Sequence, residues 1–576
     1  MKKLQNTLIC LISIVVLLLT PMTRAEAEEL QTSITGISGP ALNNAQERLA
    51  IILQGYHTPF TEKQIHAFFR AAPQEIKHAI EPYGYFKATI ESQLSQKGDI
   101  WTARFILHRG PRLHIAHLEV NITGPGQDNT ALKRLLMKFP LQPGQVLETE
   151  KYETAKKSLF QVANNQGYIK AVLEKKEIRI DLKKYTADVI LSLDTGPRYY
   201  FGAIKFDQTT FSPEFLNRFL PFQEGEPFSS QKLLLLQQNL SNSHYFQQVS
   251  IFPNIEQPNG YQVPVDVGLK ATKSQKYDVG FGYGTYTGPR LTLGANLRHV
   301  TDTGHYVKMQ MKVSPILQGL AAQYVIPGHN PLTDAYTLGV NVERFLPKNG
   351  HSISKNLSFS YTTLWQGWKT TPTLTYLREN YFIEGQPSSH NSRLFIPSLA
   401  LTRIKADDLI IPRSGHKIDF VIRGASTQMI SNTNFVQTEV KGKYIFSPTP
   451  VSTVVLSGDF GYTVVENIRS LPLTLQFFAG GMNSVRGFPY TYFGPGRYLK
   501  TGSVEYRHHI IDKWSGAVFY DLGMADDHIN APMGHGIGIG AIYDSVVGPV
   551  RLYTGFGKLK DKPRHFDFEF SIGPEL

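Results

Sequence analysis

From residue 276 onward, apolar and polar residues alternate over long runs, and this pattern restricts the fold more than any other feature of the chain. Alternation with a period of two is typical of a β-strand whose two faces meet different surroundings. The first run places Tyr277, Val279, Phe281 and Tyr283 on one side and Asp278, Gly280, Gly282 and Gly284 on the other. Further runs contain Leu293, Met309, Val340 and Phe359, and a late one contains Phe566, Phe568, Phe570 and Ile572.

The length of these runs favours a membrane-spanning β-barrel. A tilted membrane strand needs about 9 to 11 residues, which each alternating run supplies. The side that carries Lys308, Gln310 and Lys312 cannot face lipid, so we expect it to line a wet lumen. Beyond the N-terminal segment the chain has no continuous apolar run that fits a transmembrane helix. A membrane location therefore requires a closed barrel.

The number of strands separates the barrel from a soluble β-sandwich, whose strands also alternate. At roughly 19 residues per strand and connection, residues 276–576 accommodate about sixteen strands. Tyr and Phe are abundant near the strand ends, as expected of interfacial girdles. Both observations favour the barrel.

The N-terminal segment, residues 1–27, reads as a secretory signal. Lys2 and Lys3 give a basic start, residues 8–19 form a short apolar run, and Ala25-Glu26-Ala27 supplies the small-x-small pattern of a cleavage site. Cys10, the only cysteine, would leave with this segment. The expected mature chain is exported and free of cysteine, which excludes disulfides and thiolate metal sites.

The net charge of the full chain is +12. Loss of Lys2, Lys3, Arg24 and Glu26 with the signal removes three cations and one acid and leaves +10. A basic balance is compatible with nucleic acid, anionic lipid or simple solubility. Export makes nucleic acid an unsuitable partner.

The first half of the chain repeats itself with a period of about 80 residues. Residues 140–147 (PLQPGQVL) return as residues 221–228 (PFQEGEPF). Gly110-Pro111-Arg112 returns as Gly196-Pro197-Arg198. This period is too long for a solenoid unit and fits tandem small domains.

Each repeat has the element order strand, helix, helix, strand, strand. In the second repeat we expect these elements at residues 114–122, at residues 133–139, along the stripe Tyr152, Ala155, Leu159 and Val162, and at residues 171–180 and 186–193. The opening strand of the first repeat is expected near residues 34–37. The short sheet of such a unit has open edges that can accept an extended peptide.

Three such units after a signal segment resemble the polypeptide-transport-associated (POTRA) domains of the outer-membrane protein assembly family. The resemblance implies POTRA domains at residues 28–111, 112–197 and 198–272, followed by the barrel at residues 276–576. The predicted fold class is a transmembrane antiparallel β-barrel of about sixteen strands, preceded by three α/β POTRA domains of the order β-α-α-β-β.

A lone arginine stands late in the barrel region, in the sequence NSVRGFPY (residues 483–490). Val485, Arg486, Gly487 and Phe488 resemble the Val-Arg-Gly-(Tyr/Phe) signature of the assembly family, in which this loop folds back into the barrel. Gly487 allows a tight turn, and Phe488 can pack on the lumen wall. The following Gly494-Pro495-Gly496 is too broken to be a strand.

An arginine inside a barrel needs fixed acidic partners, because guanidinium is always charged and offers five donors in a planar fork. Glu505 and Asp521 match the acidic residues that hold this arginine in the family, so the resemblance implies that they hold Arg486. Each acid could equally serve only to solvate the lumen. The segment 535–556 also resembles the family's penultimate segment, with alternating glycines before Gly548-Pro549.

Other motifs that carry chemistry are weak. Gly280-x-Gly282-x-Gly284 and Gly536-x-Gly538-x-Gly540 lie in strand contexts and lack the Lys-Ser/Thr of a phosphate loop, so we interpret them as glycines of the lumen face. His508-His509 and Asp407-Asp408 have no set of metal ligands around them. The sequence shows no nucleophile elbow, and we expect no enzyme activity, cofactor or metal.

Within the assembly family, the three POTRA domains, the length and the Gly-Pro-Glu-Leu ending resemble the TamA-like subgroup. The resemblance implies an insertase in the outer membrane of a Gram-negative bacterium, with its POTRA domains in the periplasm. Its implied partners are an inner-membrane-anchored TamB-like protein that binds the POTRA domains, unfolded outer-membrane proteins including autotransporter-type clients, and outer-membrane lipid.

The resemblance also implies a lateral seam between the first strand (about residues 277–286) and the last (about 565–573). The seam residues are Tyr277, Gly280, Phe281, Gly282, Tyr283 and Gly284 with Phe566, Phe568 and Phe570. Glycines weaken packing on one face, and a client strand could pair with the opened edge. The alternative is a two-partner-type secretion pore that passes polypeptide through the lumen. A passive porin fits less well, since it needs no repeats.

Overall fold

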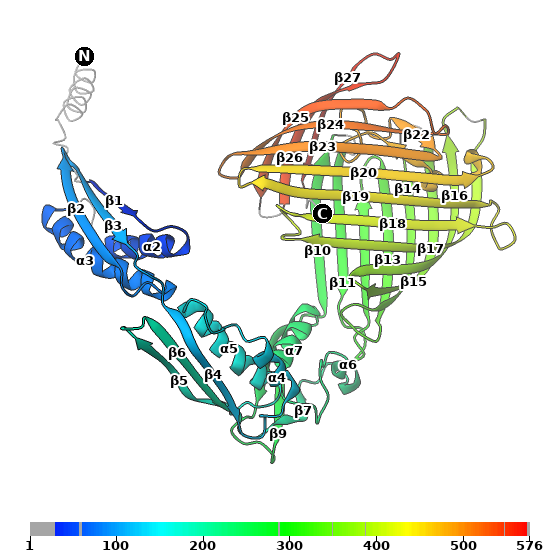
Figure 1. The fold of residues 1–576 in the computed structure, drawn as a ribbon. Coiled ribbons are helices and arrows are strands. Elements are labelled where there is room, and N and C mark those ends of the chain that lie inside the picture. Colours follow the sequence, from blue (N-terminus) through cyan, green and yellow to red (C-terminus); the bar gives the residue numbers. More distant parts are fainter. Residues whose placement is uncertain are drawn as a thin grey trace, which may run out of the picture. The chain divides into compact units, whose positions relative to one another are not determined.

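The computed structural model describes residues 29–56, 60–285, 288–347, 350–385, 387–545 and 548–572. The predicted signal segment with Cys10, and the C-terminal residues 573–576, lie outside the described residues. The chain divides into two compact units, and residues 204–222, 233–252 and 266 onward form the unit that contains the barrel. Figure 1 labels the elements of both units.

The first domain has the predicted element order. It consists of β1 (Glu29–Thr35), α2 (Pro40–Gln54), α3 (Glu62–Ile80), β2 (Thr89–Lys97) and β3 (Ile100–His108). The sheet order is β1-β3-β2, with β1 parallel and β2 antiparallel to β3. Helix α3 begins at a capping box, in which Thr61 and Gln64 satisfy each other's backbone N–H groups. Its apolar side, including Ile65, Phe68 and Ile76, is buried.

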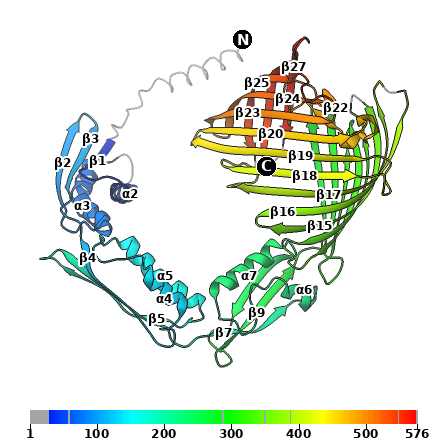
Figure 2. The ribbon, with the colours of Figure 1, turned by 45° about the vertical axis from the view of Figure 1, so that its right-hand side comes forward.

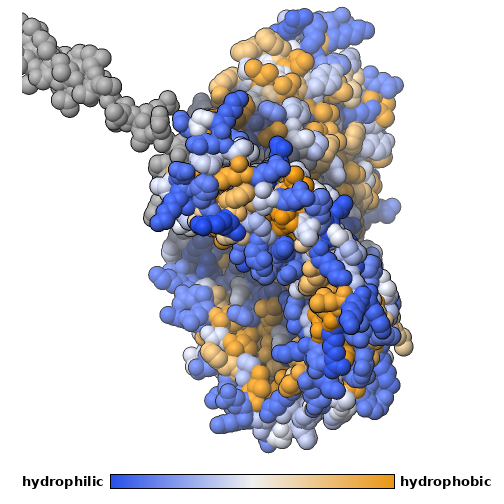
Figure 3. Space-filling model, turned by 60° about the vertical axis from the view of Figure 1, so that its left-hand side comes forward, coloured by the Kyte–Doolittle hydropathy of each residue, from blue (hydrophilic) through white to orange (hydrophobic). Residues whose placement is uncertain are grey.

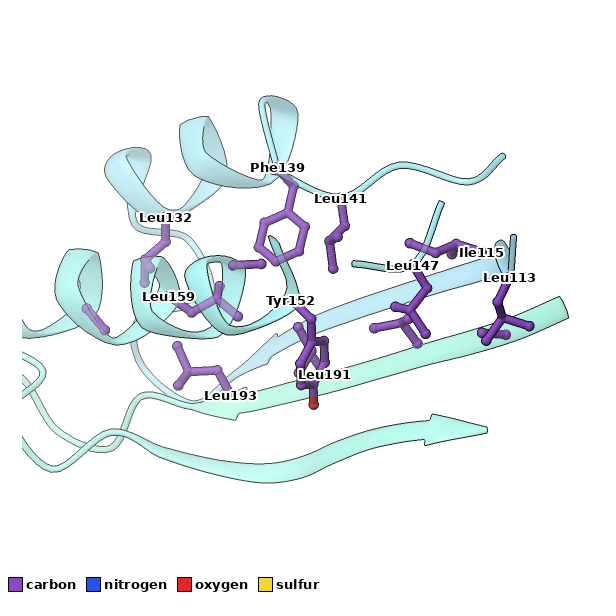
Figure 4. Close-up of a cluster of buried hydrophobic side chains, with 14 of the residues drawn as sticks. Leu113, Ile115, Leu132, Phe139, Leu141, Leu147, Tyr152, Leu159, Leu191 and Leu193 are labelled. Carbon is purple, nitrogen blue, oxygen red and sulfur yellow. The ribbon is translucent and has the colours of Figure 1, made fainter. Parts of the chain in front are cut away.

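The second domain repeats this order. Its elements are β4 (His114–Thr123), α4 (Thr130–Met137), α5 (Thr149–Asn165), β5 (Val172–Asp181) and β6 (Thr186–Asp194). Figure 4 shows the two helices on one face of the sheet, with Leu132, Leu159 and Leu191 between the layers. Helix α4 begins earlier than predicted, because Asn129 accepts hydrogen bonds from the backbone N–H groups of the first turn. In α5, Ala163 is buried where Val162 was expected, and Val162 is only partly buried.

The third domain consists of β7 (Tyr200–Asp207), α6 (Pro213–Asn217), α7 (Ser230–Asn242), β8 (Phe246–Pro253) and β9 (Gln262–Ala271), with the sheet order β7-β9-β8. Within the barrel unit, Tyr245 donates a hydrogen bond of 2.6 Å from its hydroxyl to the carbonyl oxygen of Gly304. Burial raises the pKa of the Tyr245 phenol, which keeps this donor protonated. A Cβ at Gly304 would lie 2.2 Å from the Phe215 ring, so this turn has no room for a side chain.

The barrel is a single antiparallel sheet of 16 strands that follow one another in sequence order, which confirms the predicted fold class. Figure 2 shows them from β10 (green) to β27 (red). The strands are β10 (Gln275–Gly284), β11 (Gly288–Leu297), β12 (Tyr306–Val313), β13 (Leu317–Pro327), β14 (Ala335–Phe345), β15 (Gly350–Trp365), β16 (Trp368–Ile383), β17 (His390–Ala406), β18 (Gly415–Ala425), β19 (Phe435–Thr449), β20 (Ser452–Val465), β23 (Tyr498–Ile511), β24 (Trp514–Asp526), β25 (Gly534–Ser545), β26 (Gly548–Lys558) and β27 (His565–Ile572).

The two faces of the barrel wall differ as the alternation predicts. Large apolar side chains such as Phe281, which is 83% exposed, point outward. Polar residues stand opposite one another on the inner face, and Asn296 pairs in register with Lys276 on one side and with Lys308 on the other. Across the face shown in Figure 3, hydrophobic and hydrophilic side chains are interspersed. No helix among the described residues has the length and apolar character needed to span a membrane.

The longest connection in the barrel is residues 466–497, which join β20 to β23. We call it the long loop. It contains two short 3-10 helices, Ile468–Ser470 and Leu473–Leu475, and a small sheet of β21 (Phe477–Ala479) and β22 (Phe493–Gly496). The prediction that Gly494-Pro495-Gly496 excludes a strand is therefore wrong. Pro495 falls at a register shift between the pairs Phe477–Gly496 and Ala479–Phe493, where its missing N–H breaks no regular ladder.

Candidate functional site

The long loop is attached at its beginning to the inner wall formed by β15 to β20. We call residues 468–476 the root of the loop. Glu379 of β16, fully buried, accepts hydrogen bonds from the backbone N–H of Thr474, at 3.2 Å, and from its hydroxyl. The side-chain amide of Gln437 in β19 donates to the carbonyl oxygen of Leu475 at 2.8 Å.

Apolar contacts complete the attachment of the root. Ile468, Leu471 and Leu475 pack in one buried cluster with residues of β16, β17, β19 and β20. Leu473 packs against Tyr381 and Ile383 in another. The hydroxyl of Tyr381 also donates to the carbonyl oxygen of Arg469 at 2.8 Å. Because Glu379, Gln437 and Tyr381 all bond the backbone of the loop, the root is fixed by hydrogen bonds as well as by apolar packing.

Further along, residues 482–488 form the tip of the long loop, which contains the predicted motif. Val485, Arg486 and Phe488 are all buried. The guanidinium of Arg486 donates to both carboxylate oxygens of Asp521 in β24, from Nε and from Nη2, each at 2.8 Å. The backbone N–H of Arg486 donates to the same carboxylate at 2.9 Å. Nη1 forms an ion pair with Glu505 of β23.

The structure thus brings together Arg486, Glu505 and Asp521, the three charged residues singled out from the sequence. Two buried carboxylates around one guanidinium satisfy its fork geometry, which a point charge such as lysine cannot do. Phe488, the last residue of the motif, packs among Tyr492, Phe493 and His565. The arrangement is a latch that holds the tip against β23 and β24.

Four further residues complete the latch and were not identified from the sequence. Ser503 accepts a hydrogen bond from Arg486 Nη2 at 3.0 Å and donates one to Asp521 at 2.6 Å. Phe519 and Tyr553 lie against the guanidinium, with ring centroids 3.7 and 4.8 Å from Cζ. Tyr553 and Arg507 both donate to Glu505 Oε1, at 2.9 and 2.5 Å.

Glycines on the inner wall give the tip its space. A Cβ at Gly536 would lie 2.0 Å from the carbonyl oxygen of Arg486, and a Cβ at Gly557 would lie 2.4 Å from that of Gly487. Gly487 itself has φ of 86°, which favours glycine. From the sequence, the Gly536-x-Gly538-x-Gly540 run is interpreted only as glycines of the lumen face. The structure shows that one of them, Gly536, must lack a side chain because the loop backbone lies against it.

The predicted seam lies between β10 and β27. These two strands contact each other, yet within the described residues no backbone ladder joins them, whereas every other pair of neighbours in the 16-stranded sheet is hydrogen-bonded. Tyr277, Phe281 and Tyr283 face outward on β10, as Phe566 and Phe568 do on β27. Phe570, the third predicted aromatic of β27, borders a cavity with residues of the long loop.

The inner face of β10 carries small residues near its end. A Cβ at Gly280 would have its nearest neighbour at 3.7 Å, and a Cβ at Gly282 would meet the Arg290 side chain at 3.6 Å, so either position has room for a methyl group. Gly284 pairs in register with Gly288 of β11.

Two buried carboxylates lie on the inner face of β27. Glu569 is 3% exposed, and neither of its carboxylate oxygens has a hydrogen-bond partner among the described residues. Asp567 Oδ2 is in the same situation. Unsatisfied buried polar groups are costly. The burial of these oxygens therefore opposes the packing of β27 against the lumen.

Near Arg486, the lumen is lined by basic and acidic side chains. A cavity of about 370 Å³ borders Arg486 and is lined by lysines, arginines and carboxylates, among them Lys417, Asp419 and Lys441. Among the described residues no group of three or more His, Cys, Asp and Glu side chains is placed to hold a metal ion. The geometry supports positioning of the loop and of the strand edge.

A barrel of 16 strands with three POTRA-like domains before it and a loop latched inside defines a class of bacterial outer-membrane proteins. Residues 259–575 match the model of the Omp85 superfamily domain. Residues 31–108 match the POTRA domain TamA domain 1, and residues 118–196 and 199–271 match the surface antigen variable number repeat. The chain belongs to the Omp85 superfamily and is a TamA- and BamA-like member of it.

Relatives and solved structures agree with this assignment. The chain is 21% identical over 467 residues to the outer membrane protein assembly factor BamA of Neisseria meningitidis serogroup B, covering 73% of this chain and 56% of that protein. It thus spans about half the length of this relative. The crystal structure of BamA from Haemophilus ducreyi lacking POTRA domains 1–3 superposes with a TM-score of 0.66 at 16% identity, over 80% of this chain and 99% of that one. This likeness concerns the fold.

Proposed function

We propose that the protein is an outer-membrane assembly factor that promotes the insertion or translocation of outer-membrane proteins, including autotransporter-type clients, through the seam between β10 and β27. The observation that carries the proposal is that, within the described residues, no ladder joins β10 to β27, while all other neighbours in the sheet are paired. A free strand edge in lipid leaves backbone groups unsatisfied at several kcal/mol each, so an edge that opens favours a strand that can pair with it.

The mechanism needs no cofactor or nucleotide, and the protein would not act as an enzyme. The client strand gains backbone hydrogen bonds as it pairs with β10, and those bonds replace contacts that it cannot make in lipid. Gly280 and Gly282 themselves put no side chain in the way of an arriving strand. The latch at Arg486 would keep the long loop folded on β23 to β26 while the seam opens.

The POTRA domains would lie in the periplasm, where they receive clients and a TamB-like protein anchored in the inner membrane. Short connections such as residues 450–451 and 512–513 occur at the end of the barrel where β10 begins, and short turns are typical of the periplasmic side. Strand β5 is an edge of its sheet and is largely exposed. Such an edge can add an extended segment of a partner.

The test is cysteine crosslinking at the seam in membranes. Phe281→Cys or Tyr283→Cys, on the outward face of β10, is combined with an autotransporter-type client that bears one cysteine in its last strand. We expect a disulfide-linked product whose yield changes with the register of the client cysteine. The matched control is Val340→Cys on β14, which is similarly outward-facing but lies between two paired neighbours.

Crosslinks at lumen-facing positions such as Gln310→Cys, with none at Phe281 or Tyr283, would contradict the proposal. That result would instead indicate a two-partner-type secretion pore, in which polypeptide passes through the lumen.

A further inference from the structure

Arg290 of β11 extends its side chain over β10, the strand that borders the seam. It stands directly opposite Gly282 in the register of the two strands. A Cβ at Gly282 would lie 3.6 Å from both Nε and Nη2 of Arg290, so the guanidinium lies over this glycine. Neighbouring strands are about 4.8 Å apart. The charge of Arg290 is therefore carried one strand closer to the seam than its own backbone.

Arg290 is a cation without a carboxylate partner in the part of the chain that the structure describes. Its side chain is exposed, and no ion pair or hydrogen bond joins it to an acid there. Asp278, the acidic residue of β10, is already bonded to Lys276 at 2.7 Å and to the amide of Asn296 at 2.9 Å. A guanidinium is always charged, and its fork of donors fits a carboxylate. Arg290 can therefore bind a carboxylate that comes from outside β10 and β11.

Two cavities connect Arg290 with the last strand of the barrel. One, of about 370 Å³, is bordered by Arg290 and by Glu569 and Ser571 of β27. The other, of about 380 Å³, is bordered by Arg290, by Gly282 and by Ile572 of β27. Arg290 thus borders the space on the lumen side of the seam, where a strand paired with β10 would place its inward side chains.

The lumen faces on the two sides of the seam carry opposite charge. Arg290 and Lys312 border a cavity on the side of β10, whereas the inner face of β27 carries Asp567 and Glu569. The Glu569 carboxylate has no hydrogen-bond partner among the described residues. Because β27 is the strand that stands beside β10 here, its acidic face indicates which chemistry fits that place. Opposite charges on neighbouring strands stabilise a pair, and like charges destabilise it.

We propose that Arg290 is a specificity-determining residue for the strand that pairs with β10, and that it binds a carboxylate on the lumen face of that strand. The inference rests on the proposed insertion through the seam and adds the chemistry of the client, an amphipathic strand with Asp or Glu opposite Gly282. The glycine is part of the selection, because its missing side chain lets the guanidinium reach the neighbouring strand. A client with lysine or arginine at this place would meet a like charge.

The test is a competition between clients at the seam in membranes. The full chain carries Phe281→Cys, and each client carries one cysteine in its last strand, at the register that crosslinks best. In an antiparallel pair, the client residue just before that cysteine stands opposite Gly282 and faces the lumen. This residue is glutamate, glutamine or lysine in three clients of different mass, which are supplied in equal amounts. The ratio of the disulfide-linked products measures the preference.

We expect the glutamate client to exceed the glutamine client by about two- to fivefold, the ratio that one exposed charge pair provides. The lysine client should give the least product. Arg290→Gln should bring the three yields together. Arg290→Glu should reverse the order and favour the lysine client, and this rescue would also show that the variant barrel is folded.

Arg298→Gln is the matched control. Arg298 is an even number of residues from Arg290, so it lies on the same lumen face, and it borders neither of the two cavities. The control removes the same side chain and the same charge, and it should leave the order and the ratio of the products unchanged. Loss of the preference in Arg290→Gln alone therefore reports a local contact and not a general attraction of acidic clients.

Three results would overturn the inference. Equal yields of the three clients on the chain with Arg290 intact would do so, although a register-dependent crosslink would still support the proposed insertion. The absence of any crosslink at Phe281→Cys would remove both proposals. A higher yield of all three clients in Arg290→Gln, with an unchanged ratio, would show that Arg290 serves only to hold β27 beside β10.

Discussion

At the scale of single residues, the latch depends on a match between charge and available space. Arg486 is 5% exposed, and its charge is compensated by Asp521 and Glu505, both also buried. Removing one partner from a buried ion pair leaves an uncompensated charge, at a cost of about 3–5 kcal/mol. The same tip also needs bare wall, since a Cβ at Gly536 would lie 2.0 Å from the Arg486 carbonyl oxygen.

Gly536→Ala should therefore release the tip without changing any charge. Forcing a methyl group into a packed contact costs about 1–3 kcal/mol, so the amides of residues 482–488 should exchange hydrogen faster, as measured by mass spectrometry. Gly502→Ala on β23 is the control, because a Cβ there meets nothing within 4 Å. Equal protection of the tip in both variants would show that the close approach at Gly536 does not hold the loop.

The motif and its two acids could be predicted from the sequence through resemblance, whereas Ser503, Phe519 and Tyr553 could not. These three residues reach the guanidinium through strand register. Ser503 stands opposite Asp521, and Phe519 stands opposite Glu505. No local signal in the sequence gives the register between two strands. The side chains around Arg486 can therefore be identified only once the pairing of the strands is known. The root contacts of Glu379 and Gln437 have the same origin, since each joins strand and loop residues far apart in sequence.

At the scale of elements, β27 is one of the two strands at the β10–β27 junction of the barrel. It is paired with β26 from His565 to Ile572 and has no ladder with β10 in the described residues. On its inner face it carries Glu569 and Asp567, with buried oxygens that have no hydrogen-bond partner among the described residues. Alternation in the sequence predicted this strand. The free-energy cost of burying its carboxylates depends on which hydrogen-bond donors in the lumen reach them. The alternation of the sequence does not show those donors.

Glu569→Leu should make β27 more stable. Replacing a buried, unsatisfied carboxylate with an apolar side chain removes a penalty of about 1–3 kcal/mol or more. We expect slower hydrogen exchange of the β27 amides and a higher unfolding midpoint. Glu343→Leu on β14 serves as the control, because Glu343 is only partly buried. Faster exchange in β27 of Glu569→Leu would mean that the carboxylate has a favourable role in holding the strand.

At the scale of the whole barrel, the long loop is fixed at both its root and its tip, on different parts of the wall. The root is bound to β16 and β19 through Glu379 and Gln437, and the tip to β23 and β24 through Glu505 and Asp521. Between these points the loop crosses part of the lumen. Ion flow through the barrel should depend on both attachments.

Channel conductance in planar bilayers measures this dependence. Glu379→Leu alone and Arg486→Ala alone each leave one attachment, so we expect modest increases in conductance. The double variant should show a larger increase than the two single increases added together, because only it frees the loop. Asn341→Ala, a lumen residue that touches neither attachment, is the control. If the increase in conductance of the double variant equals the sum of the two single increases, the root and the tip do not hold the long loop jointly.

The even number of barrel strands has a consequence for what can enter the sheet. With 16 strands in an antiparallel order, β10 and β27 run in opposite directions. A single strand placed between them would be antiparallel to one and parallel to the other, and parallel pairing is the less stable of the two. A hairpin can be antiparallel to both, and it returns its trailing end to the side from which it came. The even number of barrel strands therefore favours the insertion of strands in pairs between β10 and β27, whatever the sequences of those strands.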